Sequence, residues 1–222
     1  MVRSFPTCRV VRVLAVMVWL VTFGVSVDAQ EDIIWLFDGK SLDAWTFYLQ
    51  DPNAKLEDVW TIRDGVLVCR GRPVGYLRTK EEFSDYELRL EWRWPKGSSG
   101  GNSGVLVHCT TPNALGVWPK SIEVQLASGN AGDFWVIGTE ISIPDVEKRR
   151  MGRRHLNLTD GSEKPIGQWN EMVVICRGDT IKVYVNGDLV NECSKASQTK
   201  GAIALQSEGA EIQFRNIRLK KL

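Results

Sequence analysis

The sequence is poor in the residues that build metal and redox sites. It contains only two histidines, His108 and His155, too few for a zinc site made of several imidazole ligands. Its five cysteines include no Cys-x-x-Cys pair, so the common zinc and thiol-redox motifs are absent. It also lacks internal repeats, low-complexity tracts and any helical periodicity longer than about ten residues. These absences argue against a zinc-scaffold, a thioredoxin-like or a helical protein.

An excess of either charge is also missing. The chain has 28 basic and 27 acidic residues and a formal net charge of +1. Proteins that bind nucleic acid carry a basic surface, so we expect no nucleic-acid partner. One basic run, 148–150 with Arg153 and Arg154, is interpreted as a solvated or partly salt-bridged loop.

The chain has one long apolar run, at residues 13–25. Arginines precede it, and small residues at Val27 and Ala29 follow it. This pattern predicts a secretory signal peptide, residues 1–29, cleaved after Ala29. The run is short for a membrane span, although an uncleaved anchor is the alternative. We therefore expect an exported protein, periplasmic or extracellular, with no membrane association after cleavage.

Four cysteines remain after the predicted cleavage. An even number in an exported protein permits two disulfides. Three of them, Cys69, Cys109 and Cys176, lie inside apolar strand patterns, where a free thiol packs as a small hydrophobe. We therefore favour buried free thiols over disulfides.

Alternation with a period of two dominates residues 30–222. Residues 86–94 alternate apolar and charged side chains, which is typical of a strand with one buried and one solvated face. Residues 60–69 and 172–185 each fit a hairpin. Because strands recur with Gly, Asn and Asp between them, the sequence predicts a single all-β sandwich domain over residues 30–222.

Two predicted strands have an apolar and a polar face. In residues 118–126 the apolar face is formed by Ile122, Val124 and Leu126. The opposite face carries Ser121, Glu123 and Gln125. In residues 100–109 the predicted apolar set is Val105, Val107 and Cys109. Asn102 and His108 fall on the other face, so the two polar faces would form a site if they meet on one sheet.

Seven segments, in order along the chain, resemble the motifs of one family. They are LFDGKSLDAW (36–45), GNSGV (101–105), EVQ (123–125), EKPIGQWN (163–170), NG (186–187), AIALQ (202–206) and FRNI (214–217). The ordered set resembles the 3-keto-disaccharide hydrolase domain family over nearly all of residues 30–222. Two positions depart from it: Ala44 replaces a usual Gly, and His108 stands where many members have Arg or Gln.

The resemblance implies a concanavalin A-like jelly-roll of two antiparallel sheets. It also implies an exported enzyme that hydrolyses 3-keto-glycosides or 3-keto-disaccharides. The partner is then a 3-keto sugar substrate, with a separate sugar oxidoreductase as a candidate upstream source.

A ketone at C3 of a glycoside acidifies the C2 hydrogen, so a base can start elimination of the C1 substituent, and water then adds back. Such a site needs a base, an electrophile at the C3 oxygen and an acid at the leaving oxygen. Glu123 and His108 are the candidate catalytic residues. Lys120, Asn102 and Gln125 could stabilise the enolate or hold hydroxyls. A divalent metal ion held by His108 and Glu123 could replace Lys120 as electrophile.

The long segments 110–120 and 127–168 supply further candidates, since long loops often carry function. Trp118 and Trp135 could stack on a sugar ring or could anchor these loops. Asp133 is either a third site carboxylate or a turn residue, and Lys164 completes the substrate-binding candidates. An ordinary two-carboxylate glycosidase would instead pair Glu123 with Asp133 or Glu140.

Two non-enzymatic alternatives remain at this stage. A carbohydrate-binding, lectin-like module would use the same fold without proton transfer, and a structural interaction domain would have no polar cluster. The discriminating observation is whether Glu123 and His108 converge in one pocket.

Overall fold

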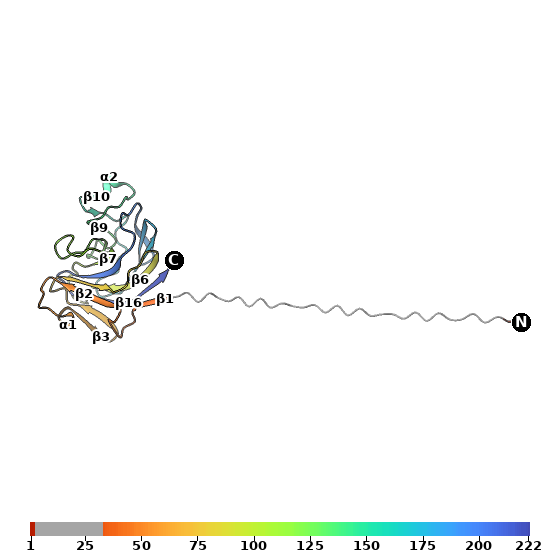
Figure 1. Cartoon of the computed structure of the whole chain (residues 1–222), viewed down its shortest axis with the longest axis horizontal. Coiled ribbons are helices and arrows are strands. Elements are labelled where there is room, and N and C mark those ends of the chain that lie inside the picture. Colours follow the sequence, from red (N-terminus) through yellow and green to blue (C-terminus); the bar gives the residue numbers. More distant parts are fainter. Residues whose placement is uncertain (3–32) are drawn as a thin grey trace. The chain divides into compact units, whose positions relative to one another are not determined.

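The computed structural model describes residues 1–2 and 33–222 (Figure 1). Apart from residues 1 and 2, the predicted signal peptide and its cleavage site lie outside the described residues, so that prediction stands as made. No helix within the described residues is long and apolar enough to cross a membrane.

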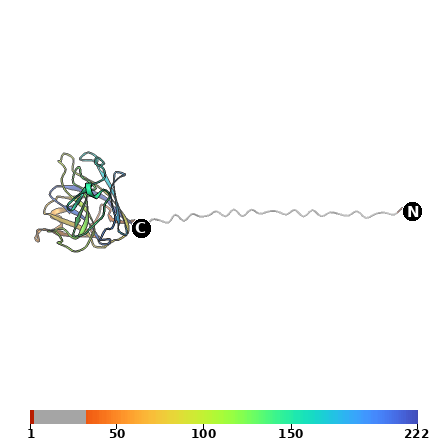
Figure 2. The same cartoon turned by 90° about the horizontal axis from the view of Figure 1, so that it is seen from above.

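The described chain forms two eight-stranded sheets, here named sheet A and sheet B (Figures 1 and 2). Sheet A has the spatial order β14 (Asp188–Cys193), β13 (Thr180–Val185), β12 (Asn170–Arg177), β6 (Tyr86–Arg93), β16 (Ile212–Lys221), β4 (Val66–Cys69) and β3 (Trp60–Arg63), and β1 (Ile33–Phe37) pairs with β16. Sheet B has the order β10 (Arg150–Met151), β11 (Arg154–His155), β9 (Phe134–Ile137), β8 (Ser121–Gln125), β7 (Gly104–Cys109), β15 (Ala202–Ser207), β5 (Gly75–Thr79) and β2 (Trp45–Leu49).

The strand pairings are antiparallel throughout the described residues. Two four-residue helices, α1 (Leu56–Val59) and α2 (Val146–Arg149), are the only α-helices among the described residues. The prediction of an all-β, two-sheet antiparallel sandwich is confirmed.

The main core lies between the sheets and follows the alternation of the strands. On β6, Tyr86, Leu88, Leu90 and Trp92 are buried, while the residues between them are partly exposed. Seven apolar side chains from the alternating segments 86–94, 100–109 and 118–126 are at most 1% exposed, as that alternation predicts: Leu88, Leu90, Trp92, Val105, Val107, Ile122 and Val124. Truncating one of the large ones, such as Leu90→Ala, would cost roughly 2–5 kcal/mol.

The outer face of sheet A is a network of paired charges. Arg89 bonds to Glu87 at 2.6 Å and to Glu171 at 3.2 Å. Arg215 bonds to Glu91 at 2.6 Å. Since every carboxylate in these contacts lies beside a cation, the charges of this face are paired within the protein and do not require a charged ligand.

A β-bulge in β7 breaks the predicted alternation. Leu106 lies opposite Ala204 and Cys109 lies opposite Ala202, so Val107 and His108 together face one residue of β15. His108 takes a left-handed backbone conformation (φ 55°). A side chain on Gly201 would collide with the His108 carbonyl, so only glycine allows this approach.

The bulge reverses two predicted orientations. Cys109 packs in a small cluster on the outer face of sheet B, together with Tyr76, Leu106 and Ile137. His108 turns towards sheet A, with its ring 5.8 Å from that of Tyr86 in an edge-to-face contact. The prediction that His108 shares a face with Glu123, opposite Cys109, is therefore wrong.

The long loops are anchored by polar contacts. Arg149, in the predicted solvated run, is buried and donates to the carbonyls of Pro144 and Leu156 and to the Asn191 side chain. The four cysteines of the described domain are free and buried, which confirms the free-thiol prediction. Burial raises the pKa of each of these thiols to about 12, so they are inert at neutral pH.

Candidate functional site

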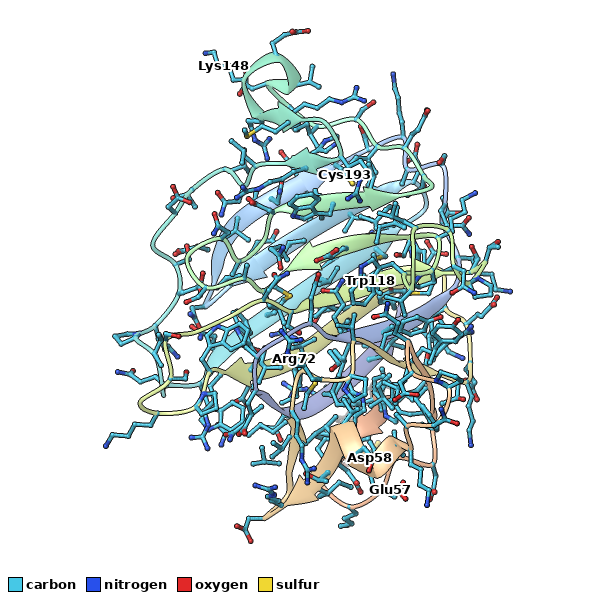
Figure 3. The ribbon with its side chains drawn as sticks, turned by 90° about the vertical axis from the view of Figure 1, so that its left-hand side faces the viewer. Glu57, Asp58, Arg72, Trp118, Lys148 and Cys193 are labelled. Carbon is cyan, nitrogen blue, oxygen red and sulfur yellow. The ribbon has the colours of Figure 1, made fainter. Side chains whose placement is uncertain are left out.

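A pocket of about 270 Å³ opens on the outer face of sheet B. It is lined by Asn102, Leu115, Trp118, Glu123, Gln125, Trp135, Ile137, Arg153 and Glu208. These residues come from β8, β9, the segments beside β7 and β15, and the loops over the sheet. Figure 3 shows Trp118 over the green strands of sheet B. Five predicted site residues, Asn102, Trp118, Glu123, Gln125 and Trp135, thus meet in one pocket.

Glu123 occupies the floor of the pocket because of its place on β8. Its neighbours in the strand, Ile122 and Val124, are in the core, so Glu123 points to the outer face as predicted. A side chain on Gly104 would come within 2.7 Å of Glu123 Oε1 and 2.6 Å of Gln206 Oε1. Gly104 thus leaves the space in which these two side chains lie side by side.

The electrostatics of the pocket centre on Glu123 and Glu208. Burial, and then the charge of Glu208, raise the pKa of Glu123 to about 8, although a Gln206 hydrogen bond and the Arg153 charge oppose the shift. Burial also raises the pKa of Glu208. Glu123 is therefore mostly protonated at pH 7. Two neighbouring carboxyl groups in different environments are a common arrangement for acid and base catalysis.

Several polar atoms in or beside the pocket are buried without a hydrogen-bond partner among the described residues. They are Asn102 Oδ1, Trp135 Nε1 and Gln206 Oε1. Gln125 Oε1 accepts from the backbone N–H groups of Leu126 and Ala127 at 2.9 Å each, which leaves its NH₂ group for the pocket. Buried polar groups rarely lack partners, so these atoms are suited to bind the hydroxyl groups of a ligand.

Three predicted substrate-binding residues do not line the pocket. Asp133 is ion-paired with Arg154 at 2.6 Å and accepts a 2.6 Å hydrogen bond from Asn157 N, so its carboxylate holds the 127–168 loop together. Lys164 Nζ donates to the Trp169 carbonyl at 3.1 Å. Lys120 lies one residue before β8 and packs beside Gly138.

His108 is also excluded from the pocket by the bulge. Its Nδ1 lies 3.0 Å from the Gln198 carbonyl oxygen, and burial lowers the pKa of the imidazole. It therefore lies on the opposite face of sheet B from Glu123. The two side chains cannot hold one metal ion together, which corrects the predicted His108–Glu123 metal site. No group of three or more His, Cys, Asp or Glu residues is placed to hold a metal ion in the part of the chain that the structure describes.

Sequence reasoning missed Glu208, Arg153 and Gln206. Gln206 was visible as the last residue of the AIALQ motif, and Glu208 follows it by two positions. Arg153 was seen only as part of a basic run. The carboxyl group that meets Glu123 is thus Glu208, and neither Asp133 nor Glu140 lines the pocket.

Comparisons with known proteins agree with this architecture. Residues 32–220 match the family described as the 3-keto-alpha-glucoside-1,2-lyase-like domain. A protein of Bacteroides thetaiotaomicron named 3-keto-disaccharide hydrolase is 26% identical over 241 residues, covering 88% of this chain and 80% of its own.

Among solved structures, a candidate glycosyl hydrolase of Parabacteroides distasonis is 26% identical with a TM-score of 0.61, covering 86% of this chain and 99% of its own. The carbohydrate-binding module CBM66 of Bacillus subtilis is 12% identical with a TM-score of 0.57, covering 80% of this chain and 96% of its own. At this low identity the similarity shows only the shared jelly-roll fold. With its fold, its ordered motifs and a match over residues 32–220, the chain belongs to the 3-keto-alpha-glucoside-1,2-lyase-like domain family.

Proposed function

We propose that this protein cleaves 3-keto-glycosides by elimination and hydration in the pocket around Glu123 and Glu208. Family membership, the relative named 3-keto-disaccharide hydrolase and structural neighbours described as glycosyl hydrolases support a carbohydrate-active function. The observation that carries the proposal is that the buried Glu123, whose pKa is raised to about 8, shares the pocket with the partly buried Glu208. A binding module needs no such proton donor.

The elimination begins at C2 of the keto sugar. The Glu208 carboxylate removes the C2 proton, and the C–H electron pair becomes the enolate of the C3 ketone. The enolate then re-forms the C3 carbonyl and a C1–C2 double bond while the C1–O bond breaks. Glu123 gives its proton to the departing oxygen. The expectation that Glu123 acts as the base is thus replaced by a role as the acid, because its pKa of about 8 lies above neutral pH.

Hydration returns both residues to their starting states. The Glu123 carboxylate takes a proton from water, whose oxygen bonds to C1 of the unsaturated ketone. Glu208 then returns its proton to C2. Asn102 and Gln125 line the pocket and are the candidates for stabilising the enolate oxygen and holding hydroxyls.

The test uses 3-keto-glucosides beside the matching unoxidised glucosides. Only the keto sugars should be cleaved. Glu123→Gln should slow release of the leaving group by roughly 10²–10⁴-fold, the usual contribution of a positioned acid or base. It should still allow exchange of the C2 hydrogen with deuterated water, whereas Glu208→Gln should abolish that exchange. A wild-type protein that binds keto sugars without converting them would support the lectin-like module instead.

The proposal extends to cellular context. We propose that the protein is exported by its N-terminal segment and receives its keto sugar from a separate oxidoreductase. N-terminal sequencing of the exported protein should begin near Gln30, and soluble protein that retains Met1 would contradict export by cleavage.

A further inference from the structure

A second, open groove of about 640 Å³ adjoins the pocket at the edge of sheet B. Its polar lining consists of Thr139, Glu140, Arg150, Arg153 and Ser197. Arg153 lines both the pocket and the groove. Two strand spacings, about 10 Å, separate β8 from β11. The second ring of a disaccharide can span that distance, so a substrate bound at Glu123 would extend past Arg153 into the groove.

The arginines of this groove differ from their neighbours in sequence. Arg149 and Arg154 are tied to loop carbonyls and to Asp133. Arg150 and Arg153 form no salt bridge within the described residues. Arg150 makes a 3.3 Å hydrogen bond to the Gly152 carbonyl of its own hairpin, and Arg153 makes one of the same length to the Val136 carbonyl of β9. The Arg153 guanidinium also lies 5.4 Å from the Trp135 ring.

The lining of the groove therefore carries a net positive charge. Glu140 is the one carboxylate in its lining, against two guanidinium groups. The buried His155 responds to the same charge: burial first, and then Arg150 and Arg149, lower the pKa of its imidazole. Guanidinium groups bind carboxylates through two parallel hydrogen bonds, and the Thr139 and Ser197 hydroxyls, 2.8 Å apart, offer contacts for sugar hydroxyls.

We propose that this groove binds an acidic leaving group, in its simplest form a uronic acid linked to the keto sugar. The inference rests on the proposed function and adds to it the class of the leaving group. Arg150 and Arg153 would hold the carboxylate, while the keto ring lies at Glu123 and Glu208.

The experiment compares two substrates with the same linkage, 3-keto-glucosyl-glucuronic acid and 3-keto-glucosyl-glucose, which differ only by one carboxylate. At low salt the wild-type kcat/KM should favour the acidic substrate by about tenfold, which corresponds to one charge-assisted contact of about 1.4 kcal/mol. Arg150→Gln should remove most of this preference through KM, and added salt should weaken it. Lys148→Gln is the matched control, since Lys148 is exposed on α2 outside both cavities (Figure 3).

The outcomes separate the two proposals. Equal kcat/KM values for two substrates that are both cleaved would overturn the acidic subsite and leave the proposed function intact. If neither is cleaved, the proposed function fails, and calorimetry with the unoxidised disaccharides still tests the groove. Equal dissociation constants for the acidic and neutral sugars would then overturn the inference, and tighter binding of the acidic one that Arg150→Gln abolishes would support it.

Discussion

On the outer face of sheet A each carboxylate of the ion-pair network lies beside a cation, whereas on the outer face of sheet B Glu123 lies beside Glu208. Glu91 accepts hydrogen bonds from Arg215 and Asn216, and its pKa is lowered because these contacts and nearby cations outweigh its partial burial. The pKa of Glu123 moves in the opposite direction. The outer face of sheet A thus has paired carboxylates and is here called the compensated face. The outer face of sheet B is called the uncompensated face, because Glu123 lies beside another carboxyl group and keeps its proton.

The tryptophans Trp169 and Trp135 differ less sharply. Trp169 lies between two guanidinium groups, with Arg93 and Arg215 4.4 Å and 4.2 Å from its ring. Those cation–π contacts are already made within the chain. Trp135 also lies near two guanidinium groups, at the longer distances of 5.4 Å for Arg153 and 5.9 Å for Arg154. It lines the pocket together with Trp118, however, and its Nε1 lacks a partner in the described structure. Cation–π contacts alone therefore do not separate the two tryptophans, whereas a place in a pocket and an unpartnered ring N–H mark Trp135 as a candidate ligand contact.

The same substitution on the two faces tests the comparison most strongly. Glu123→Gln should lower kcat on a 3-keto-glucoside by roughly 10²–10⁴-fold. Glu91→Gln should leave kcat and KM within about twofold, because Glu91 lies on the other sheet. Steady-state kinetics on both variants, with circular dichroism to verify folding, gives the result. Similar losses in both variants would mean that the charge contrast does not mark the active face.

Stability should also separate the two glutamates as pH changes. The folded-state pKa of Glu123, about 8, lies above the unfolded value near 4.5. The contribution of Glu123 to the free energy of unfolding is fully present below pH 4.5. It is lost as pH rises through 8, since the unfolded chain releases the proton more easily than the folded protein. Glu123→Gln should therefore be more stable than wild type at pH 9, by on the order of a few kcal/mol. Urea unfolding at pH 4 and pH 9 measures it, and a difference that does not grow with pH would contradict the raised pKa.

Gly104 offers a test of how the uncompensated face is built. Gly104→Ala places a methyl group against Glu123 and Gln206, so these side chains must move. We expect a loss of about 1–3 kcal/mol in the free energy of unfolding, the usual range for an overpacked site. Turnover should fall while the affinity for unoxidised glucosides changes less. Full activity in this variant would show that Glu123 need not lie over Gly104.

The smallest expected effect concerns the stability of the compensated face. The Arg215–Glu91 pair is partly exposed, with relative exposures of 38% and 23%. Such pairs contribute up to about 1 kcal/mol, so Glu91→Gln should lower the free energy of unfolding by no more than that near pH 7. Thermal unfolding at low and high salt checks this. A loss several times larger would make the network a main support of the fold.

The sequence predicts features that depend on local periodicity. Strands such as β6 and β8 alternate in the sequence, so their buried faces, and the orientation of Glu123, follow from a period of two. His108 was assigned to the wrong face because the bulge depends on β15, where Gly201 allows the backbones to approach. No pattern within residues 100–109 reports on that distant glycine.

The sequence also did not predict which side chains from distant segments lie beside Glu123 and Asp133. Glu208 follows β15 and reaches Glu123 of β8 only because both strands flank β7. Asp133 was an open candidate until its contacts with Arg154 and Asn157 were known. In both cases the sequence gives the type of the residue, but the order of the strands in the sheet determines which side chain lies next to it in space.

The position of the β10–β11 hairpin at the edge of sheet B has an evolutionary consequence. The hairpin pairs with the sheet only through β9, so its length and charge can change without altering the pairing of β7, β8 and β15. Glu123 lies on the interior strand β8 and Glu208 directly follows β15, whereas the groove arginines lie at this edge. The lining of the groove can therefore diversify among relatives, or be redesigned by exchanging a few hairpin residues, without moving Glu123 or Glu208.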